Sequence, residues 1–349
     1  MAERIGVGLL GATGVVGQQF VARLASHPWF RLTWLGASER SEGRPYRDCA
    51  AWRLPIPLPE DVGAMTVSGV VPGSAPRLVF SALDASVAGE VEAAFAAAGH
   101  LVVSNSKNHR MEPDVPLLIP EVNAGQLALV GHQRARRGWS GAIVTNPNCS
   151  TVILVMTLAP LRQFGLRAVS VTTLQALSGA GYPGVASLDA IGNVVPFIDG
   201  EERKIETETG KILGEVRGDT VVPHDAVVSA QATRVPVPNG HTMAVSVRLD
   251  ARPSAMDIRR AFETFMGGPA VAGLPSAPAR PVVYLDGDAR PQPRLDVGTG
   301  DGMTVSVGRL RECPVLGWKY VALGDNVVRG AAGGAILNAE LMRAEGMLT

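Results

Sequence analysis

The chain has 349 residues, a length at which two domains that share one cleft are a common arrangement. Hydrophobic residues make up 46% of the sequence and charged residues 18%, which excludes a disordered chain and provides the side chains of a large core. The 32 basic residues balance 32 acidic ones, so no overall field attracts nucleic acid or an anionic membrane, and any anion must be bound by local groups.

The first part of the chain alternates short apolar runs with helical segments. Strands and helices are expected here at residues 5–10, 18–26, 32–36, 78–82, 85–98 and 101–104. Strands that alternate with helices indicate an α/β fold with a Rossmann-type, doubly wound parallel sheet. Proline-rich stretches at 55–59 and 113–120 are expected to be loops at the rim of this sheet.

The pattern of predicted elements changes after residue 150. A helix is expected from about 150 to 163, and the strands and the final helix that follow are expected at 168–177, 227–235, 241–249, 305–310, 318–323 and 326–342. In the third of these strands Met243, Val245 and Val247 alternate with smaller or polar residues, which is typical of a sheet with one buried face. We therefore expect a second, largely antiparallel α+β domain, with residues 266–300 as a long surface loop.

Glycines recur at every third position from residue 8 to residue 17, between a strand and a helix. Such bare backbone lets a pyrophosphate approach the amide groups at the start of the helix, although glycine turns also serve packing alone. After the second strand, Ser38, Arg40 and Ser41 suit the 2′-phosphate of NADP, whereas Glu39 suits the free hydroxyl of NAD.

The segment from residue 146 to residue 151 reads Asn-Pro-Asn-Cys-Ser-Thr and is the most informative motif. Asn148 is a typical helix cap, and Cys149 then stands at the start of an apolar helix. The positive end of the helix dipole would favour the thiolate, the form that attacks a carbonyl carbon. The alternative interpretation is a small buried hydrophobic residue, as we expect for Cys49 and Cys313.

Polar residues also occur near the ends of the strands predicted in the second half. His241 opens a strand, where it would transfer protons or be an ordinary surface histidine. Gln175 either points outward or orients a water or a substrate carbonyl. On a helix Glu201 and Lys204 would share one face. They could bind a zwitterion or a phosphate there, or they could simply form a solvated charged face. Arg234 has the planar fork that matches a carboxylate.

The three cysteines are few and widely separated, which argues against a disulfide framework and against a thiolate zinc site. The N-terminus shows no secretion signal, and the longest apolar stretches are shorter than the roughly 20 residues that span a bilayer. We therefore expect a cytoplasmic protein with no metal, no membrane partner and no nucleic-acid partner.

Taken together, these segments resemble aspartate-β-semialdehyde dehydrogenase over nearly the whole chain, and its archaeal and fungal branch in particular. The matching segments are Gly8-Leu-Leu-Gly-Ala-Thr-Gly-Val-Val-Gly17, Ser104-Asn-Ser-Lys-Asn-His-Arg110, Asn146-Pro-Asn-Cys-Ser-Thr151, Gln175-Ala-Leu-Ser-Gly-Ala-Gly-Tyr-Pro-Gly184, Glu201-Glu-Arg-Lys204 and Arg234-Val-Pro-Val-Pro-Asn-Gly-His241. The resemblance implies a dinucleotide-binding domain at 1–148, completed by a C-terminal helix at 326–349. It implies a catalytic and dimerisation domain at 149–325.

The resemblance also implies roles for individual residues. Cys149 would be the nucleophile, His241 the acid and base, and Gln175 the residue that orients the reacting group. Substrate contacts are implied for Arg234, Glu201, Lys204, Arg110 and Asn148. Contacts with NADP are implied for Gly11, Thr13, Gly14, Val15, Val16, Ser38, Arg40, Ser41, Ser81, Ser178, Gly179, Gly181 and Asn326.

The implied reaction is the NADPH-dependent reduction of L-aspartyl 4-phosphate to L-aspartate 4-semialdehyde through a thioester on Cys149. This reaction belongs to the biosynthesis of lysine, threonine, methionine and isoleucine, and a homodimer or homotetramer is expected. The alternatives are an acyl-CoA reductase that acts on a substrate such as malonyl-CoA, and a catalytically dead dinucleotide-binding homologue. The sequence does not indicate a role for the basic segment at 132–137.

Overall fold

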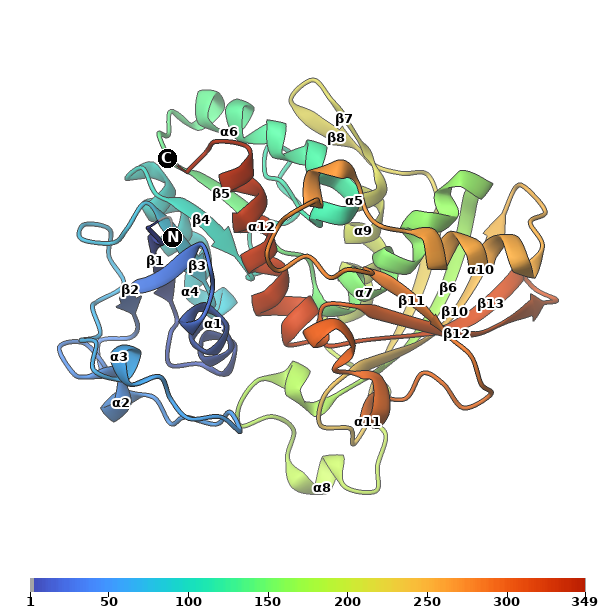
Figure 1. The fold of residues 1–349 in the computed structure, drawn as a ribbon, viewed down its shortest axis with the longest axis horizontal. Helices are drawn as coiled ribbons and strands as arrows, with labels where there is room; N and C mark the ends of the chain where they lie inside the picture. The colour runs from blue at the N-terminus through green and yellow to red at the C-terminus, as the bar shows by residue number, and fades with distance from the viewer. Residues whose placement is uncertain (1–2, 349) are drawn as a thin grey trace.

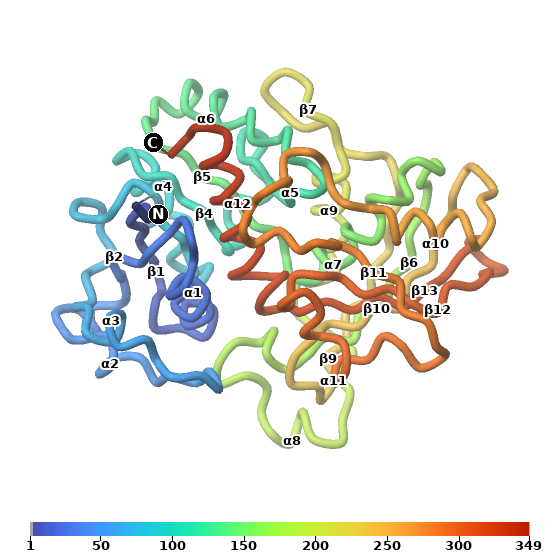
Figure 2. The backbone as a smooth tube through the Cα atoms, viewed as in Figure 1, coloured from blue at the N-terminus to red at the C-terminus, as the bar shows by residue number. Residues whose placement is uncertain are grey.

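The computed structural model describes residues 3–348, which form two large sheets that lie side by side (Figures 1 and 2). The first sheet is parallel throughout and confirms the predicted Rossmann-type arrangement. Its strands, in spatial order, are β2 (Phe30–Gly36), β1 (Ile5–Leu10), β3 (Leu78–Ser81), β4 (Leu101–Ser104) and β5 (Ala142–Thr145). The chain leaves β1 for one edge and then returns to β3 on the other side, which opens a crevice at the carboxyl ends of these two strands.

Side chains of this sheet alternate between two cores. On β4, Leu101 and Val103 join the core that contains helices α1 (Val15–Ala25) and α12 (Gly333–Ala344), whereas Val102 joins Phe95 of α4 (Ala85–Ala97) on the other face. Helices therefore cover both faces, which is the reason that these parallel strands are continuous apolar runs.

The second sheet is largely antiparallel, as predicted, but its two edge pairs make it mixed. Its strands, in spatial order, are β11 (Val282–Leu285), β12 (Val305–Cys313), β13 (Gly317–Gly324), β10 (His241–Leu249), β6 (Leu166–Gln175) and β9 (Val227–Arg234). The four central strands pair antiparallel, but both edge pairs, β11 with β12 and β6 with β9, are parallel. The prediction failed at the edges because alternating hydrophobicity reports which face is buried and carries no information on strand direction.

One face of the second sheet is covered by α7 (Cys149–Leu158), α9 (Glu201–Leu213) and α10 (Ala255–Thr264). Val169 and Val171 of β6 point into this core, whereas Ser170, Thr172 and Leu174 between and beside them are exposed. The alternation predicted from the sequence is therefore present, and the far face of the sheet is left open to its surroundings.

Two loop predictions were wrong in part. Residues 113–120 are not at the rim, because Val115, Leu117 and Leu118 are fully buried and Leu117 forms a bridge with Thr145 at the end of β5. Residues 266–300 contain β11, whose four-residue apolar run is too short to stand out among the surrounding prolines and glycines.

The C-terminal helix also starts differently from the prediction. A π-helical turn at Val328–Ala332 precedes α12, and Arg329 within this turn is fully buried. Its Nη1 and Nη2 donate to the two carboxylate oxygens of Glu121, at 2.5 and 2.9 Å. This ion pair joins the turn to α5 (Pro120–Asn123).

The remaining elements are short. They are α2 (Tyr46–Cys49), α3 (Glu60–Gly63), α6 (Leu129–Arg137), α8 (Ser187–Ala190), α11 (Pro293–Asp296), β7 (Glu215–Arg217) and β8 (Thr220–Val222). The basic segment 132–137 forms the end of α6, where Arg137 binds the carboxylates of Glu112 and Asp114. None of the helices in residues 3–348 is long and apolar enough to cross a membrane.

Candidate active site

The cysteine predicted to be the nucleophile lies at the first position of α7. The side-chain oxygen of Asn148 accepts hydrogen bonds from the backbone N–H groups of Ser150 and Thr151, at 2.9 and 3.1 Å, which confirms the predicted cap. The cap fixes the first turn of the helix and with it the direction of the Cys149 side chain.

His241 is the partner of this cysteine. It is fully buried at the first position of β10, and its Nε2 lies 3.3 Å from the Cys149 sulfur. The backbone N–H of Ala176 donates to the other ring nitrogen, Nδ1, at 3.1 Å. Because Nδ1 accepts a hydrogen bond, the neutral ring carries its proton on Nε2 and presents a donor to the sulfur.

Glu201, the first residue of α9, is the centre of the polar contacts. Its Oε1 accepts from Asn148 Nδ2 at 2.8 Å and from Gln175 Nε2 at 3.1 Å, and its Oε2 accepts from Lys204 Nζ at 2.8 Å. Burial raises the pKa of Glu201, but the charge of Lys204 and these hydrogen bonds outweigh it, so the pKa is lowered. The carboxylate is therefore ionised beside the thiol.

Arg110 and Arg234 lie at the border of the same site. Arg234 donates from Nη1 to the carbonyl of Ala176 at 2.7 Å. Arg110 donates to Glu208 Oε1 at 2.9 Å, and Glu208 Oε2 accepts from the backbone N–H of Asn148 at 2.7 Å. Glu208 therefore links the arginine to the helix of the nucleophile. Sequence reasoning missed this residue, although its spacing from Glu201 along α9 was visible.

Asn326 connects the cysteine and histidine site with the glycine loop that follows β6. Its Oδ1 accepts from the backbone N–H of Gly240 at 2.9 Å, and its Nδ2 donates to Ser178 Oγ at 2.9 Å. A Cβ on Gly179 would approach the His241 ring to 3.0 Å, so this loop packs directly on the histidine. Gly181 has a φ of +71° and open space around it.

The predicted dinucleotide turn lies at the crevice between β1 and β3. Gly14 is the N-terminal cap residue of α1, and a Cβ there would meet only one atom, at 3.5 Å, so the approach to this helix end is open. The backbone N–H groups of Val15 and Val16 belong to the first turn of α1, where a helix has no acceptors of its own. Gly17 has a different task, because a Cβ there would come within 2.4 Å of the Gly11 carbonyl oxygen.

A pocket of about 530 Å³ follows the end of β2. Ser38, Glu39 and Arg40 line one side, and Leu83 and Val87 line an apolar side next to α4. This combination of an apolar wall and a charged rim fits an adenosine with a ribose phosphate.

Not all predicted cofactor positions reach this pocket. Ser41 is buried, its carbonyl accepts a hydrogen bond from the Cys49 thiol, and it is absent from the lining. Ser81 is fully buried at the end of β3. Thr13, by contrast, is half-buried in the glycine turn.

Comparisons with known proteins agree with this arrangement. Residues 6–130 match the family model of the semialdehyde dehydrogenase NAD binding domain, and residues 158–329 match that of the semialdehyde dehydrogenase dimerisation domain. The aspartate-semialdehyde dehydrogenase of Methanothermobacter thermautotrophicus is 51% identical, with 97% of this chain and 99% of the relative covered. That of Cryptococcus neoformans is 50% identical, with 99% and 98% covered.

A solved structure shows the same fold. The aspartate semialdehyde dehydrogenase of Candida albicans with NADP is 42% identical and superposes with a TM-score of 0.91, covering 99% of this chain and 100% of the other. The chain belongs to the aspartate-semialdehyde dehydrogenase family.

In this member of the aspartate-semialdehyde dehydrogenase family two effects on the thiol oppose each other. A helix N-terminus stabilises a negative charge by about 0.3–1 kcal/mol, less than the roughly 1.4 kcal/mol of one pKa unit. Burial, reinforced by the charge of Glu201, raises the pKa of Cys149 to about 12 against the attraction of Arg110, Lys204 and Arg234. Burial therefore opposes the stabilisation of the thiolate that is expected from the helix end.

The resting enzyme is expected to react slowly with iodoacetamide at neutral pH. Because the pKa of Cys149 lies near 12, the rate of its alkylation should rise about tenfold per pH unit from about pH 7 to about pH 10. Mass spectrometry of the Cys149 peptide at each pH measures this rate. A plateau below about pH 8.5 would show that the helix and the surrounding cations outweigh burial after all.

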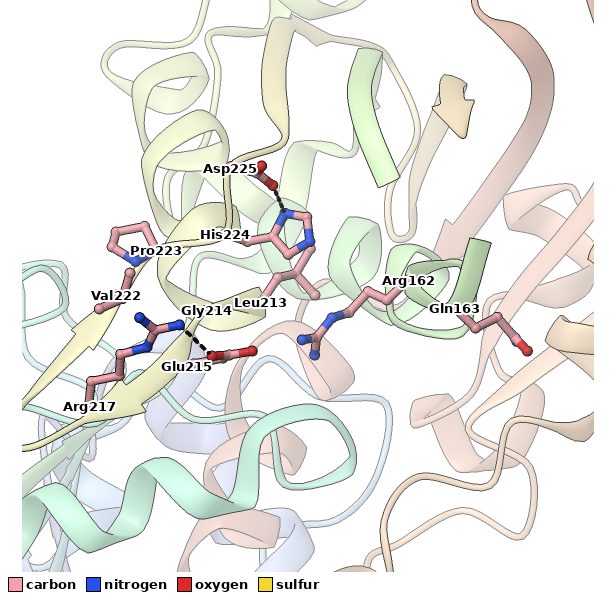
Figure 3. Close-up of a pocket in the computed structure, with 10 residues that line it drawn as sticks. All are labelled: Arg162, Gln163, Leu213, Gly214, Glu215, Arg217, Val222, Pro223, His224 and Asp225. Atoms are coloured by element: carbon pink, nitrogen blue, oxygen red, sulfur yellow. Dashed lines mark hydrogen bonds and ion pairs between the residues drawn. The ribbon is translucent and has the colours of Figure 1, made fainter. Parts of the chain in front are cut away.

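Another pocket, which is polar and has a volume of about 520 Å³, lies apart from this site (Figure 3). It is lined by residues that include Arg162, Glu215 and His224, around the C-terminal end of α9. Glu201 begins the same helix, about 18 Å away at about 1.5 Å per residue. The pocket therefore takes no part in the chemistry at Cys149. Residues 3–348 contain no cluster of three or more His, Cys, Asp or Glu side chains that could hold a metal ion.

Proposed function

We propose that the protein catalyses the NADPH-dependent reductive dephosphorylation of L-aspartyl 4-phosphate to L-aspartate 4-semialdehyde. The observation that carries this proposal is the 3.3 Å contact between the Cys149 sulfur and His241 Nε2, in a site where the charges of Glu201, Arg234 and Lys204 act on the thiol. An acyl-CoA reductase needs a nucleophilic cysteine but no group for a substrate ammonium. The ionised Glu201 therefore favours the amino-acid substrate.

The substrate is proposed to lie between these charged residues. The guanidinium of Arg234 binds its α-carboxylate, and Glu201 binds its ammonium group. Lys204 and Arg110 attract the phosphate, and Asn148 and Gln175 orient the acyl group between them. These roles place opposite charges against each charged group of the substrate, which gives orientation as well as affinity.

The reaction then takes place at the sulfur of Cys149. The Cys149 sulfur attacks the acyl carbon, the C–O bond to phosphate breaks, the thiol proton leaves with the departing phosphate, and a thioester remains on Cys149. NADPH, when bound, supplies the hydride that reduces this thioester. As the thiohemiacetal oxygen re-forms a carbonyl, the C–S bond breaks, and the Nε2–H of His241 stabilises the departing thiolate by hydrogen bonding.

The cofactor positions support NADP. The open helix end at Gly14 fits the pyrophosphate, and Arg40 with Ser38 at the pocket rim fits a 2′-phosphate, whereas Glu39 fits a free hydroxyl. The relative from Candida albicans was solved with NADP. Activity with NADP is therefore expected to exceed activity with NAD.

The reverse reaction gives the direct test. Purified protein is expected to reduce NADP with L-aspartate 4-semialdehyde beyond a single turnover only when phosphate is present, and absorbance at the NADPH maximum follows the rate. NAD replaces NADP in a parallel assay. A protein that is inactive here but oxidises NADPH with malonyl-CoA would contradict the substrate assignment and support an acyl-CoA reductase.

A homodimer or homotetramer is part of the proposal. The far face of the second sheet is open, β9 is an edge strand, and the loop beside it exposes large apolar side chains. These side chains are Tyr182, Leu188, Ile191, Val194 and Phe197. Light scattering after size exclusion should report at least twice the mass of one chain, and a single-chain mass would contradict this proposal.

A cytoplasmic location is also part of the proposal, because the reaction requires Cys149 as a free thiol. Cell fractionation followed by immunoblotting tests it. Recovery of the protein in a secreted or membrane fraction would contradict it.

A further inference from the structure

Helix α9 carries a stripe of alternating charges towards the site. Glu201, Lys204, Glu208 and Lys211 follow one another at intervals of three or four residues, so they lie on one face of the helix. The first two contact each other beside the thiol, and Glu208 binds Arg110. The last member of the stripe, Lys211, has no role in the proposed function.

Lys211 is a buried lysine with unusually complete hydrogen bonding. Only 4% of its surface is exposed, and its Nζ donates to the backbone carbonyls of Arg110, Glu112 and Val115 at 2.7, 2.7 and 2.8 Å. An ammonium group has three N–H donors, and each of them meets one of these carbonyls. The lysine therefore ties together one loop, residues 110–115.

The electrostatic surroundings keep this lysine charged at neutral pH. Burial lowers its pKa to about 8, and the carboxylates of Glu112, Asp114 and Glu208 oppose that shift. A buried charge is retained only where paired or hydrogen-bonded groups replace water. Here the groups that replace water around the ammonium are mainly the three carbonyls of the loop. Removing the ammonium would therefore leave these buried carbonyls without their donor.

The loop in question presents Arg110 to the site. Glu208 holds the Arg110 side chain, whereas Lys211 holds its backbone carbonyl, and both come from the same face of α9. On the other side of the loop Arg137, from the basic segment, binds Glu112 and Asp114. The 110–115 loop is therefore bound both by Lys211 and by Arg137 of the basic segment 132–137, to which the sequence assigned no role.

We propose that Lys211 is a positioning residue that holds the 110–115 loop in the shape in which Arg110 receives the substrate phosphate. This proposal rests on the proposed function, because it assigns Arg110 to the phosphate. It requires no contact between Lys211 and the substrate. A loop released from Lys211 would move the guanidinium, and a displacement of about 1 Å can lower a rate by about 10²-fold.

The test separates phosphate use from hydride transfer. In the direction of semialdehyde oxidation the thioester and NADPH form before phosphate attacks. In Lys211→Met we therefore expect the KM for phosphate to rise at least about tenfold, while the pre-steady-state burst of NADPH keeps its amplitude and rate within about twofold. The KM for the semialdehyde should also stay within about twofold of the wild-type value.

Two further variants keep the result interpretable. Lys211→Arg retains the charge, but its planar fork does not match three carbonyls around one nitrogen, so an intermediate KM for phosphate is expected. It replaces Lys211→Met if the latter does not fold, as judged by circular dichroism. Lys319→Met, the same substitution on β13 away from the site, should leave both quantities unchanged.

The outcomes are distinct. An unchanged KM for phosphate in the folded Lys211 variants, or a burst that falls in parallel with phosphorolysis, would overturn the positioning role. A wild-type enzyme that shows neither a burst nor phosphate dependence would instead overturn the proposed function.

Discussion

Replacing Cys149 with serine is expected to lower the rate of phosphate-dependent NADP reduction by at least about 10³-fold. A serine hydroxyl is a much weaker nucleophile than a thiolate and needs a base to activate it. His241 Nε2 is the ring nitrogen that faces this position, because Nδ1 accepts a hydrogen bond from the backbone N–H of Ala176, and a serine hydroxyl loses its proton far less readily than a thiol. Steady-state rates over a range of substrate concentrations measure the loss.

The chain offers a matched control for this substitution. Cys313 is also a free cysteine and lies at the end of β12, where its sulfur contacts Ser246 at 3.9 Å. Cys313→Ser should retain the wild-type rate and should not change NADP binding by fluorescence titration. Substantial turnover by Cys149→Ser, with a loss in Cys313→Ser, would disprove the assignment of the nucleophile.

The sequence predicted those parts of the fold that depend on local periodicity. The limits of β4 and β10 agree with the predicted strands, because alternation and buried apolar runs end at turn residues. Strand direction at the edges of the second sheet and the buried path of residues 113–120 depend on contacts between distant segments. A short apolar segment between prolines has the same composition in a surface loop and in a core.

The candidate site shows the same division. Cys149 and His241 lie 92 positions apart in the chain, and it was the resemblance of their motifs to a known family that paired them. Glu208 and Lys211 belong to no recognised motif, and only their helical spacing from Glu201 could have indicated them. Their importance comes from what they contact, which the sequence does not state. The raised pKa of Cys149 is likewise a consequence of burial, which the local motif does not state.

The substitution of Gly330 by alanine is expected to have the second largest effect. Gly330 lies in the π-helical turn before α12, and a Cβ there would come within 2.6 Å of the Cys149 Cβ and 3.0 Å of its Cα. The turn cannot easily withdraw, because the neighbouring Arg329 is held by Glu121. We expect kcat to fall by about 10²-fold and the free energy of unfolding to fall by about 1–3 kcal/mol.

Gly131 in α6 is the matched control for Gly330, because a Cβ there would meet no atom within 4 Å. Gly131→Ala should leave kcat unchanged and raise the free energy of unfolding by up to about 1 kcal/mol, since alanine favours the helix. Urea denaturation and steady-state kinetics on both variants measure these quantities. A normal kcat in Gly330→Ala would mean that the turn yields to the methyl group, and that the cysteine is positioned by its own helix cap alone.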